Sequence, residues 1–206
     1  MFELGIYGGT YAPVHNGHIA AAEAFLAQAK LDKLLIIPTL IPPHKQLSYR
    51  DDPRDRLNML HLAFDGHDEY DKRIFISEYE LNSPPPSYTV NTLKHFTEAG
   101  TRITFLCGTD MFLTLDKWRS PAEIFRLSRI ALMPREAEIS PELEERIAEQ
   151  TYFYKKVYNA DIIRITAPAI EISSSQIRSG DEAVRKKYLP DAVYEYITEH
   201  KLYEHN

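Results

Sequence analysis

Short apolar runs alternate with longer segments of helical period along most of the chain, and this alternation is the feature that most limits the fold. The runs are rich in β-branched and aliphatic residues, which is typical of strands covered on both faces. They lie at residues 3–7, 33–38, 73–77, 102–107, 129–134 and 161–166, and the helical patterns lie at 16–30, 53–65, 88–99, 120–127 and 140–151. Strands that alternate with helices imply right-handed crossovers and one parallel sheet. We therefore predict an α/β fold with a doubly wound, Rossmann-like parallel sheet.

Size and composition limit the classes of protein to which the chain can belong. With 206 residues, of which 44% are hydrophobic, it can bury one substantial core, and it contains no internal repeat or flexible linker. The single Cys107 excludes a disulfide framework and a cysteine-rich zinc site, and it fits a reducing compartment. The formal net charge of −6 disfavours tight binding to nucleic acid that is independent of the nucleic-acid sequence. Without a signal-peptide pattern or a run of 18 apolar residues, we expect a cytoplasmic protein with no membrane or nucleic-acid partner.

Two proline-rich segments, at residues 41–45 and 83–89, follow predicted strands. In an open parallel sheet, such loops lie at the carboxyl edge, where ligands bind. We therefore expect a ligand site at this edge. The alternative, that these prolines only stiffen turns, stays open for each of them.

The turn after the first predicted strand contains Gly8, Gly9 and Thr10, and His15 and His18 follow at the start of a helix. The dinucleotide fingerprint G-x-G-x-x-G is absent, so the sequence lacks the main pattern that would indicate a bound NAD or FAD cofactor. Glycines let backbone amides approach a phosphate, and a helix N-terminus adds N–H donors and partial positive charge. The alternatives are a solvated histidine pair or a metal site, but no third ligand lies beside the pair. We predict a donor-rich pocket for a polyphosphate.

A second anion-binding pattern, "EISSSQIRSG" at residues 171–180, follows the last predicted strand. Ser173, Ser174 and Ser175 are candidate helix N-caps, and Arg178 would lie one turn into that helix. Hydroxyls, amides and a guanidinium at one helix entrance can hold an oxyanion. Alone, this pattern could be a plain capping motif with an exposed arginine. Together with the histidine turn, it predicts the opposite side of a triphosphate site.

The segments "GGTYAPVHNGH" and "ISSSQIR" resemble the T/H-x-x-H and I-S-S-T-x-I-R motifs of the nucleotidyltransferase superfamily. Within it, the chain is similar to bacterial nicotinate-nucleotide adenylyltransferases, through "IIPTLIPPHK", "PSYTVNTLKHF", "FLCGTDMFLTLDKW" and "LPDAVYEYITEHKLY". This resemblance implies one nucleotidyltransferase domain over residues 1–206, with a C-terminal helical segment from about 172 to 206 that carries the serine motif. It also implies transfer of the adenylyl group of ATP to nicotinic acid mononucleotide in NAD biosynthesis, with release of pyrophosphate.

The resemblance assigns catalytic roles to His15, His18 and Arg178. The histidines would contact the ATP phosphates, with His18 nearest the α-phosphate, and Arg178 would hold the departing pyrophosphate. The remaining residues that it places at ATP are Gly8, Gly9, Thr10, Gly108, Asp110, Ser173 and Ser174. Asp110 could instead be a helix N-cap. Mg²⁺ is implied as a cofactor that the substrate phosphates hold, with no protein metal site.

The residues that the resemblance places at the mononucleotide are His44, Lys45, Tyr88, Thr89, Trp118 and Arg135. Trp118 would stack on the pyridine ring, although a lone tryptophan can equally be a core residue. The three cationic candidates would hold the phosphate, and the alternative for each is an ordinary solvated side chain. Backbone amides near Tyr88 and Thr89, or beside Trp118, could receive a carboxylate and so select nicotinate over nicotinamide.

Two departures from the family pattern stand out. Tyr11, Ala12 and Pro13 replace Phe-Asp-Pro, and the missing carboxylate is expected to loosen this loop or change how Mg²⁺-bound water is held. Ser175 replaces threonine and keeps the hydroxyl. The competing interpretations are a related transferase that uses nicotinamide mononucleotide or another phosphate acceptor, and a nucleotide-binding homologue with impaired catalysis. The sequence leaves the oligomeric state open, a homo-oligomer included.

Overall fold

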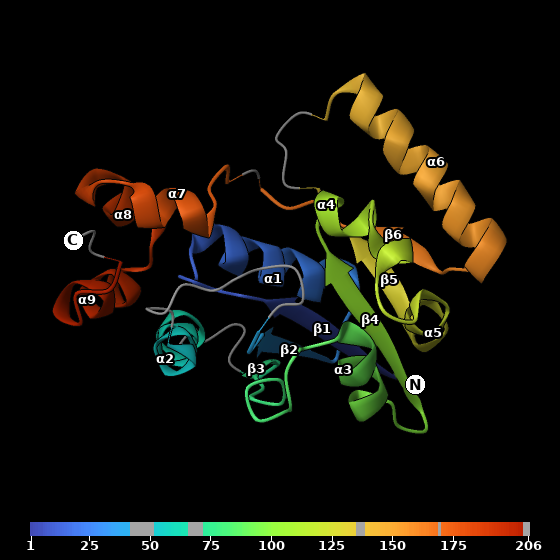
Figure 1. The fold of residues 1–206 in the computed structure, drawn as a ribbon, viewed down its shortest axis with the longest axis horizontal. Coiled ribbons are helices and arrows are strands. Elements are labelled where there is room, and N and C mark those ends of the chain that lie inside the picture. The colour runs from blue at the N-terminus through green and yellow to red at the C-terminus, as the bar shows by residue number, and fades with distance from the viewer. Residues whose placement is uncertain (42–51, 66–71, 135–138, 169, 204–206) are drawn as a thin grey trace.

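Six parallel strands form one sheet in the order β3-β2-β1-β4-β5-β6, with helices on both faces (Figure 1). The computed structural model describes residues 1–41, 52–65, 72–134, 139–168 and 170–203. The strands are β1 (Phe2–Gly9), β2 (Lys33–Pro38), β3 (Ile74–Ile76), β4 (Thr101–Cys107), β5 (Ser128–Leu132) and β6 (Ile162–Arg164). Each neighbouring pair is parallel. The predicted doubly wound α/β sheet is confirmed.

The strand order reverses beside β1, which pairs with β2 on one side and with β4 on the other. The chain therefore winds away from β1 in both directions, and the loops after β1 and β4 diverge at the carboxyl edge. Such a switch point leaves a crevice where open α/β sheets bind their ligands. The segment "GGTYAPVHNGH" leads directly out of β1 at this place.

Two apolar clusters fill the space between the sheet and its helices. The helical elements are α1 (Asn16–Gln28), α2 (Pro53–Phe64), α3 (Thr89–Phe96), α4 (Thr109–Phe112), the 3-10 helix η1 (Leu115–Lys117), α5 (Pro121–Leu127), α6 (Pro141–Tyr158), α7 (Ser174–Ser179), α8 (Glu182–Tyr188) and α9 (Asp191–Glu199). Leu34 and Ile36 of β2 belong to the cluster under α1, α2 and α9, whereas Leu35 and Ile37 belong to the cluster under α3, α5 and α6. Because both faces are covered, β2 is apolar at every one of these positions.

Helix α6 is longer than the helix predicted at residues 140–151. It begins after Ser140, whose side chain accepts a hydrogen bond from a backbone N–H, and it ends at Asn159 in the left-handed conformation, with φ 52°. The aromatic residues of its last turns have modest helix propensity, which favoured an earlier end. Tyr154 is fully buried, so tertiary packing extends the helix beyond what local propensity indicates.

Several other boundaries differ from the prediction by a few residues. The strands predicted at 73–77, 129–134 and 161–166 are shorter, and the helix predicted at 88–99 ends at Phe96. Element ends depend on hydrogen bonds to neighbours that local patterns do not reveal. The predicted C-terminal helical segment is present as α7, α8 and α9 in the described part of the chain.

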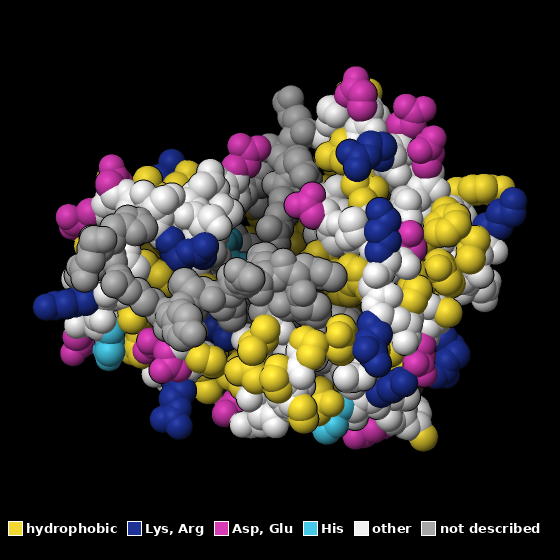
Figure 2. All heavy atoms as spheres, in the orientation of Figure 1, with side chains coloured by type: hydrophobic (Ala, Val, Ile, Leu, Met, Phe, Trp, Pro, Cys, Tyr) yellow, Lys and Arg dark blue, Asp and Glu magenta, His cyan; other side chains and the backbone are white. Residues whose placement is uncertain are grey.

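The described surface supports few conclusions about partners. Among the residues that the structure describes, no helix has both the length and the apolar character needed to cross a membrane. On the face seen in Figure 2, Lys and Arg side chains are interspersed with Asp and Glu, so the described part of that face carries mixed charge. The cytoplasmic location and the homo-oligomer stay predictions.

Candidate active site

The turn after β1 and the start of α7 are joined by direct hydrogen bonds. The Ser174 hydroxyl donates to the carbonyl of Pro13 at 2.9 Å, across 161 positions of sequence. Nη1 of Arg178 donates to the carbonyl of Ala12 at 2.6 Å, across 166 positions. The structure therefore brings together the two segments that the sequence analysis assigned to one polyphosphate.

His15 and His18 lie ring against ring, in a tilted arrangement, at the start of α1. His15 is the N-cap of the helix and is only 5% exposed, and the two ring centroids lie 3.7 Å apart with an interplanar angle of 31°. The backbone N–H of His15 donates to Nδ1 of His18 at 3.2 Å. Because Nδ1 of His18 accepts this bond, the neutral ring carries its proton on Nε2. Nε2 of His18 is thus set up as a hydrogen-bond donor.

A cavity of about 310 Å³ lies between the start of α1, the end of β5 and the start of α7. Its polar groups come from both motifs and include His15, His18 and Ser173. The other lining residues are Tyr7, Gly17, Ala21, Met133, Pro134, Ala167, Pro168, Ile170, Glu171, Ile172 and Gln176. A lining that combines imidazoles and hydroxyls with apolar side chains suits a ligand with a phosphate group and a flat apolar ring.

Gly17 lies between the two histidines and was missed by the sequence analysis. A Cβ atom at this position would approach Nδ1 and Cε1 of His15 to 3.1 Å and the carbonyl oxygen of Ile170 to 3.5 Å. The glycine therefore lets the helix start pass close to the imidazole and to the segment before α7. Its place between histidines in the motif was the available signal.

We expect Gly17→Ala to lower kcat/KM by about tenfold, because the new methyl group lies too close to the His15 ring and forces it to shift by a few tenths of an ångström. Steady-state kinetics with both substrates would check this. The melting temperature should change little, since alanine suits the first turn of a helix better than glycine does. Wild-type kinetics in this variant would contradict the account of the turn.

The start of α7 is capped by its own side chains. The Ser173 hydroxyl accepts from the backbone N–H of Gln176 at 3.2 Å, and Oε1 of Gln176 accepts from the backbone N–H of Ser173 at 2.8 Å. Ser173 is therefore the N-cap, as the sequence indicated, and it also lines the cavity. Ser174 instead directs its proton to Pro13, so it holds the turn after β1.

The guanidinium of Arg178 donates hydrogen bonds to two acceptors in the protein. Besides the carbonyl of Ala12, it donates through Nη2 to the Ser175 hydroxyl at 3.2 Å. An arginine has five N–H groups in a planar fork, so these two contacts leave capacity for an anion. The Ala12 contact uses a backbone carbonyl. The turn is therefore held in place without the carboxylate that the family pattern has at this position.

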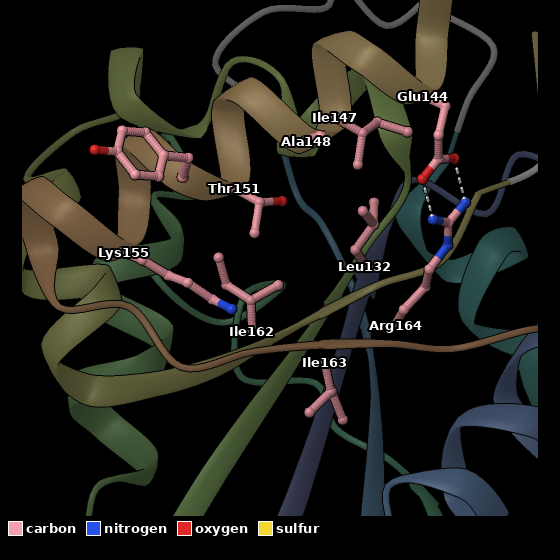
Figure 3. A pocket seen from close by; sticks show the side chains of 10 residues that line it. Leu132, Glu144, Ile147, Ala148, Thr151, Lys155, Ile162, Ile163 and Arg164 are labelled. Carbon is pink, nitrogen blue, oxygen red and sulfur yellow. Dashed lines mark hydrogen bonds and ion pairs between the residues drawn. The ribbon is translucent and has the colours of Figure 1, made fainter. Parts of the chain in front are cut away.

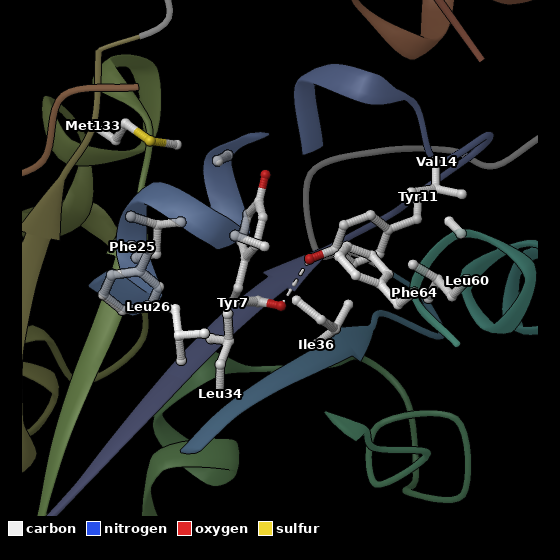
Figure 4. Close-up of a cluster of buried hydrophobic side chains, with 14 of the residues drawn as sticks. Tyr7, Tyr11, Val14, Phe25, Leu26, Leu34, Ile36, Leu60, Phe64 and Met133 are labelled. Carbon is white, nitrogen blue, oxygen red and sulfur yellow. Dashed lines mark hydrogen bonds between the residues drawn. The ribbon is translucent and has the colours of Figure 1, made fainter. Parts of the chain in front are cut away.

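Tyr11 packs against the ring of His18, a role that the sequence analysis did not assign to it. Its backbone lies in the left-handed region, with φ 52°, and its side chain is fully buried. The hydroxyl donates to the carbonyl of Tyr7 at 2.7 Å, which Figure 4 shows within the buried cluster. The ring meets that of His18 edge-on, with 5.0 Å between centroids. Tyr11 thus fixes one side of the imidazole.

Arg56 of α2 is a second residue that the sequence analysis missed. Its side chain is fully buried. Nη1 donates to the carbonyls of Thr10 at 2.8 Å and Thr39 at 2.7 Å, and Nη2 donates to that of Leu40 at 3.4 Å. A single guanidinium therefore connects the turn after β1 with the loop after β2. An arginine on the otherwise apolar face of the helix was the signal that could have identified it.

Gly8 and Gly9 are the last two residues of β1, which continues beyond the strand predicted at residues 3–7. A Cβ atom on Gly8 would meet no atom of the described residues within 4 Å, so this backbone leaves room for a ligand. A Cβ atom on Gly9 would meet the Tyr11 ring at 2.9 Å. Thr10 is held through its carbonyl by Arg56. The backbone at this turn is thus open to a ligand at Gly8 and closely packed at Gly9.

Gly108 and Asp110 lie at the end of β4, beside β1 in the sheet. Gly108 is the N-cap of α4, and Asp110 lies exposed in its first turn. The alternative reading of Asp110 as an N-cap is therefore wrong. Both residues are at the carboxyl edge but outside the lining of the 310 Å³ cavity. Their role at ATP stays a proposal.

The structure also brings together Tyr88, Thr89 and Trp118. Trp118 directly follows η1 and is half-buried, with its ring edge-on to Phe105 at 6.3 Å between centroids. The guanidinium of its neighbour Arg119 lies 4.8 Å over the Tyr88 ring, which joins the tryptophan loop to the start of α3. His44, Lys45 and Arg135 lie outside the described residues.

A larger hollow of about 430 Å³ lies elsewhere, between α6 and β6 (Figure 3). Apolar residues such as Ile147 and Ile162 line it, and Arg164 makes two hydrogen bonds to Glu144 at one end, of 2.6 and 2.8 Å. This contact holds the pKa of the Glu144 carboxyl below its usual value. None of the motif residues lines the hollow.

Comparison with known proteins places this arrangement in a defined class. A cytidylyltransferase-like family model matches residues 6–180, which include both motifs. The chain is a nucleotidyltransferase of that class. Relatives with the name "Probable nicotinate-nucleotide adenylyltransferase" from Clostridium botulinum and Caldicellulosiruptor saccharolyticus are 34% and 30% identical, over 99% and 98% of this chain and 100% and 99% of their own. The chain therefore belongs to the nicotinate-nucleotide adenylyltransferase family.

Solved structures show the same fold. The nicotinic acid mononucleotide adenylyltransferase of Plasmodium falciparum, complexed with NaAD, matches with a TM-score of 0.76 over 100% of this chain and 99% of that one. The same protein complexed with APC matches with a TM-score of 0.74. Sequence identity is 17% in both cases, so these matches bear on the fold alone.

Proposed function

We propose that the protein transfers the adenylyl group of ATP to nicotinic acid mononucleotide, which gives nicotinic acid adenine dinucleotide and pyrophosphate in NAD biosynthesis. The observation that carries the proposal is the meeting of the two motifs, where Ser174 and Arg178 bond to the turn that leads into the histidines. The full-length relatives, which bear the name of this activity, support the same reaction.

In this reaction an oxygen of the mononucleotide phosphate attacks the α-phosphorus of ATP. A new P–O bond forms, and the bond to the oxygen that bridges the α- and β-phosphorus breaks on the opposite side. Such transfers depend on positioning and on stabilisation of charge. Nε2 of His18 would donate to the α-phosphate oxygens as they gain charge, with His15 beside it. The N–H groups of Arg178 that bond to neither Ala12 nor Ser175 would hold the departing pyrophosphate.

Mg²⁺ fits this site as a partner of ATP. The polar groups that line the cavity are imidazoles, hydroxyls and an amide, with Glu171 as the one carboxylate among the described lining residues. A single carboxylate does not make the cage of several oxygen ligands that a protein site for Mg²⁺ needs. In the described ranges, no group of three or more His, Cys, Asp and Glu side chains could hold a metal ion. We therefore propose that the substrate phosphates hold the ion, which would neutralise part of their charge.

The start of α3 is our candidate for the nicotinate carboxylate. Its N-cap, Tyr88, makes no side-chain capping bond, and its first turn contains no acidic residue. The amides there can therefore receive an anion, and the helix dipole favours a carboxylate over a neutral amide. Trp118, beside Arg119 and Tyr88, would supply the flat surface for the pyridine ring.

We expect Trp118→Ala to raise the KM for the mononucleotide by about tenfold, because loss of a stacked aromatic surface costs roughly 1–2 kcal/mol of binding. The KM for ATP should change little. Trp118→Phe is the matched control and should retain most of the affinity. An equal loss for both substrates would place the tryptophan in the scaffold instead.

Product analysis tests the proposed function directly. The protein is incubated with ATP, Mg²⁺ and either nicotinic acid mononucleotide or nicotinamide mononucleotide, and the products are identified by mass. We expect the acid dinucleotide together with pyrophosphate, at a higher kcat/KM than with the amide. Equal kcat/KM for both acceptors would contradict the carboxylate site, and absence of any dinucleotide would contradict the function.

A further inference from the structure

Glu80 is the one acidic side chain that is buried among the residues the structure describes, with 7% of its surface exposed. It lies between β3 and α3, and its Oε1 accepts a hydrogen bond from the Thr92 hydroxyl at 2.6 Å. Thr92 belongs to the first turns of α3, and its backbone N–H donates to the carbonyl of the N-cap Tyr88 at 3.4 Å. A carboxyl group is therefore fixed beside the start of α3, although neither motif contains it.

The same carboxyl group faces the loop after β2. The hydroxyls of Ser87 and Thr39 both point toward it. Ser87 immediately precedes the N-cap of α3, and its backbone N–H donates to the carbonyl of Ile41 at 3.1 Å. Glu80 therefore lies where the start of α3 meets the segment that leaves β2.

From Thr39 the hydrogen bonds continue to the turn after β1. The backbone N–H of Thr39 donates to the carbonyl of Gly9 at 2.9 Å. The carbonyl of Thr39 accepts from Arg56, which also donates to the carbonyl of Thr10. The two substrate sides of the crevice are thus connected through buried polar groups.

The surroundings of Glu80 differ from those of an ordinary surface carboxylate. Burial is the main influence on Glu80 and raises the pKa of its carboxyl, against the smaller opposing effect of the Thr92, Ser87 and Thr39 hydroxyls. Its second oxygen, Oε2, is buried without a well-aligned hydrogen-bond partner among the described residues.

We propose that Glu80 is a positioning residue for the acceptor nucleotide, which holds the start of α3 against the loop after β2 so that the α3 amides face the nicotinate carboxylate. This inference rests on the proposed function. Glu80 itself does not touch the substrate. It acts through Thr92 and through the loop that contains Thr39.

The test compares Glu80→Gln with Glu80→Ala in the full chain. Glutamine keeps the shape, offers an acceptor to Thr92 and carries no charge, so its KM values should stay within about threefold of wild type. Alanine leaves the Thr92 hydroxyl without its acceptor, and we expect the KM for nicotinic acid mononucleotide to rise about tenfold. The KM for ATP should stay within about twofold, and the preference for the acid over the amide should fall.

Thr92→Val provides a second variant of nearly unchanged shape, which decides the question if Glu80→Ala does not fold. Valine replaces only the hydroxyl by a methyl group, and this variant should raise the KM for nicotinic acid mononucleotide by about threefold to tenfold. The inference is overturned if glutamine behaves like alanine, if both KM values rise together, or if no variant affects the mononucleotide. Failure of the proposed function would be distinct, because the wild-type protein would then form no dinucleotide.

Discussion

His18→Ala should lower kcat by about a hundredfold to a thousandfold while the fold stays intact. The reason is that Nε2 of His18 is a donor held in place before the reaction, by the His15 backbone N–H on Nδ1 and by the Tyr11 ring. Steady-state rates of pyrophosphate release at saturating substrates would measure the effect. Circular dichroism and the melting temperature would show that the fold is retained.

His18→Gln is the control for this variant. The amide of glutamine reaches about as far as Nε2 and can donate one hydrogen bond, so this variant should recover part of the lost rate. If alanine and glutamine were both close to wild type, His18 would not stabilise the transition state. If both variants unfolded, the histidine would serve the structure of the helix start.

Arg178→Ala should lower kcat/KM for ATP by about a hundredfold or more, because one guanidinium holds the turn at Ala12 and has further N–H groups that can donate to pyrophosphate oxygens. Arg178→Lys tests the two functions together. A lysine carries the charge but lacks the planar fork, so it cannot make both contacts in the same geometry. We expect it to restore only a small part of the activity.

The measurement for Arg178 is steady-state kinetics with ATP varied at saturating mononucleotide. Ser179→Ala, on the same helix, is a suitable control because its hydroxyl bonds only to backbone carbonyls within α7 among the contacts described. Full activity of Arg178→Ala would contradict the account, as would a lysine variant equal to wild type.

The architecture could be predicted because it follows from local patterns. The apolar run of β2 indicates a strand covered on both faces, and the alternation with helices specifies parallel pairing. The helix starts at His15 and Ser173 were likewise visible, since capping residues and the entry into a helix are local features. These patterns were sufficient to place both motifs at one edge of the sheet.

The supporting residues could not be predicted because they depend on contacts between distant segments. Arg56 and Glu80 are charged residue types that are usually exposed, and only the folded chain shows them buried against loop carbonyls and hydroxyls. The replacement of aspartate by Ala12 was expected to loosen its loop or to change how Mg²⁺-bound water is held, and this stays a prediction. In the structure, the backbone carbonyls of Ala12 and Pro13 accept hydrogen bonds from Arg178 and Ser174, and these contacts do not involve the side chain at position 12.

The most direct test of the account is a crystal structure of the protein with Mg²⁺ and a non-hydrolysable ATP analogue. The account predicts the analogue's phosphates between the start of α1 and the start of α7, with Nε2 of His18 and the guanidinium of Arg178 both within hydrogen-bonding distance of phosphate oxygens. Phosphates bound elsewhere, or contacted by only one of these two segments, would contradict it.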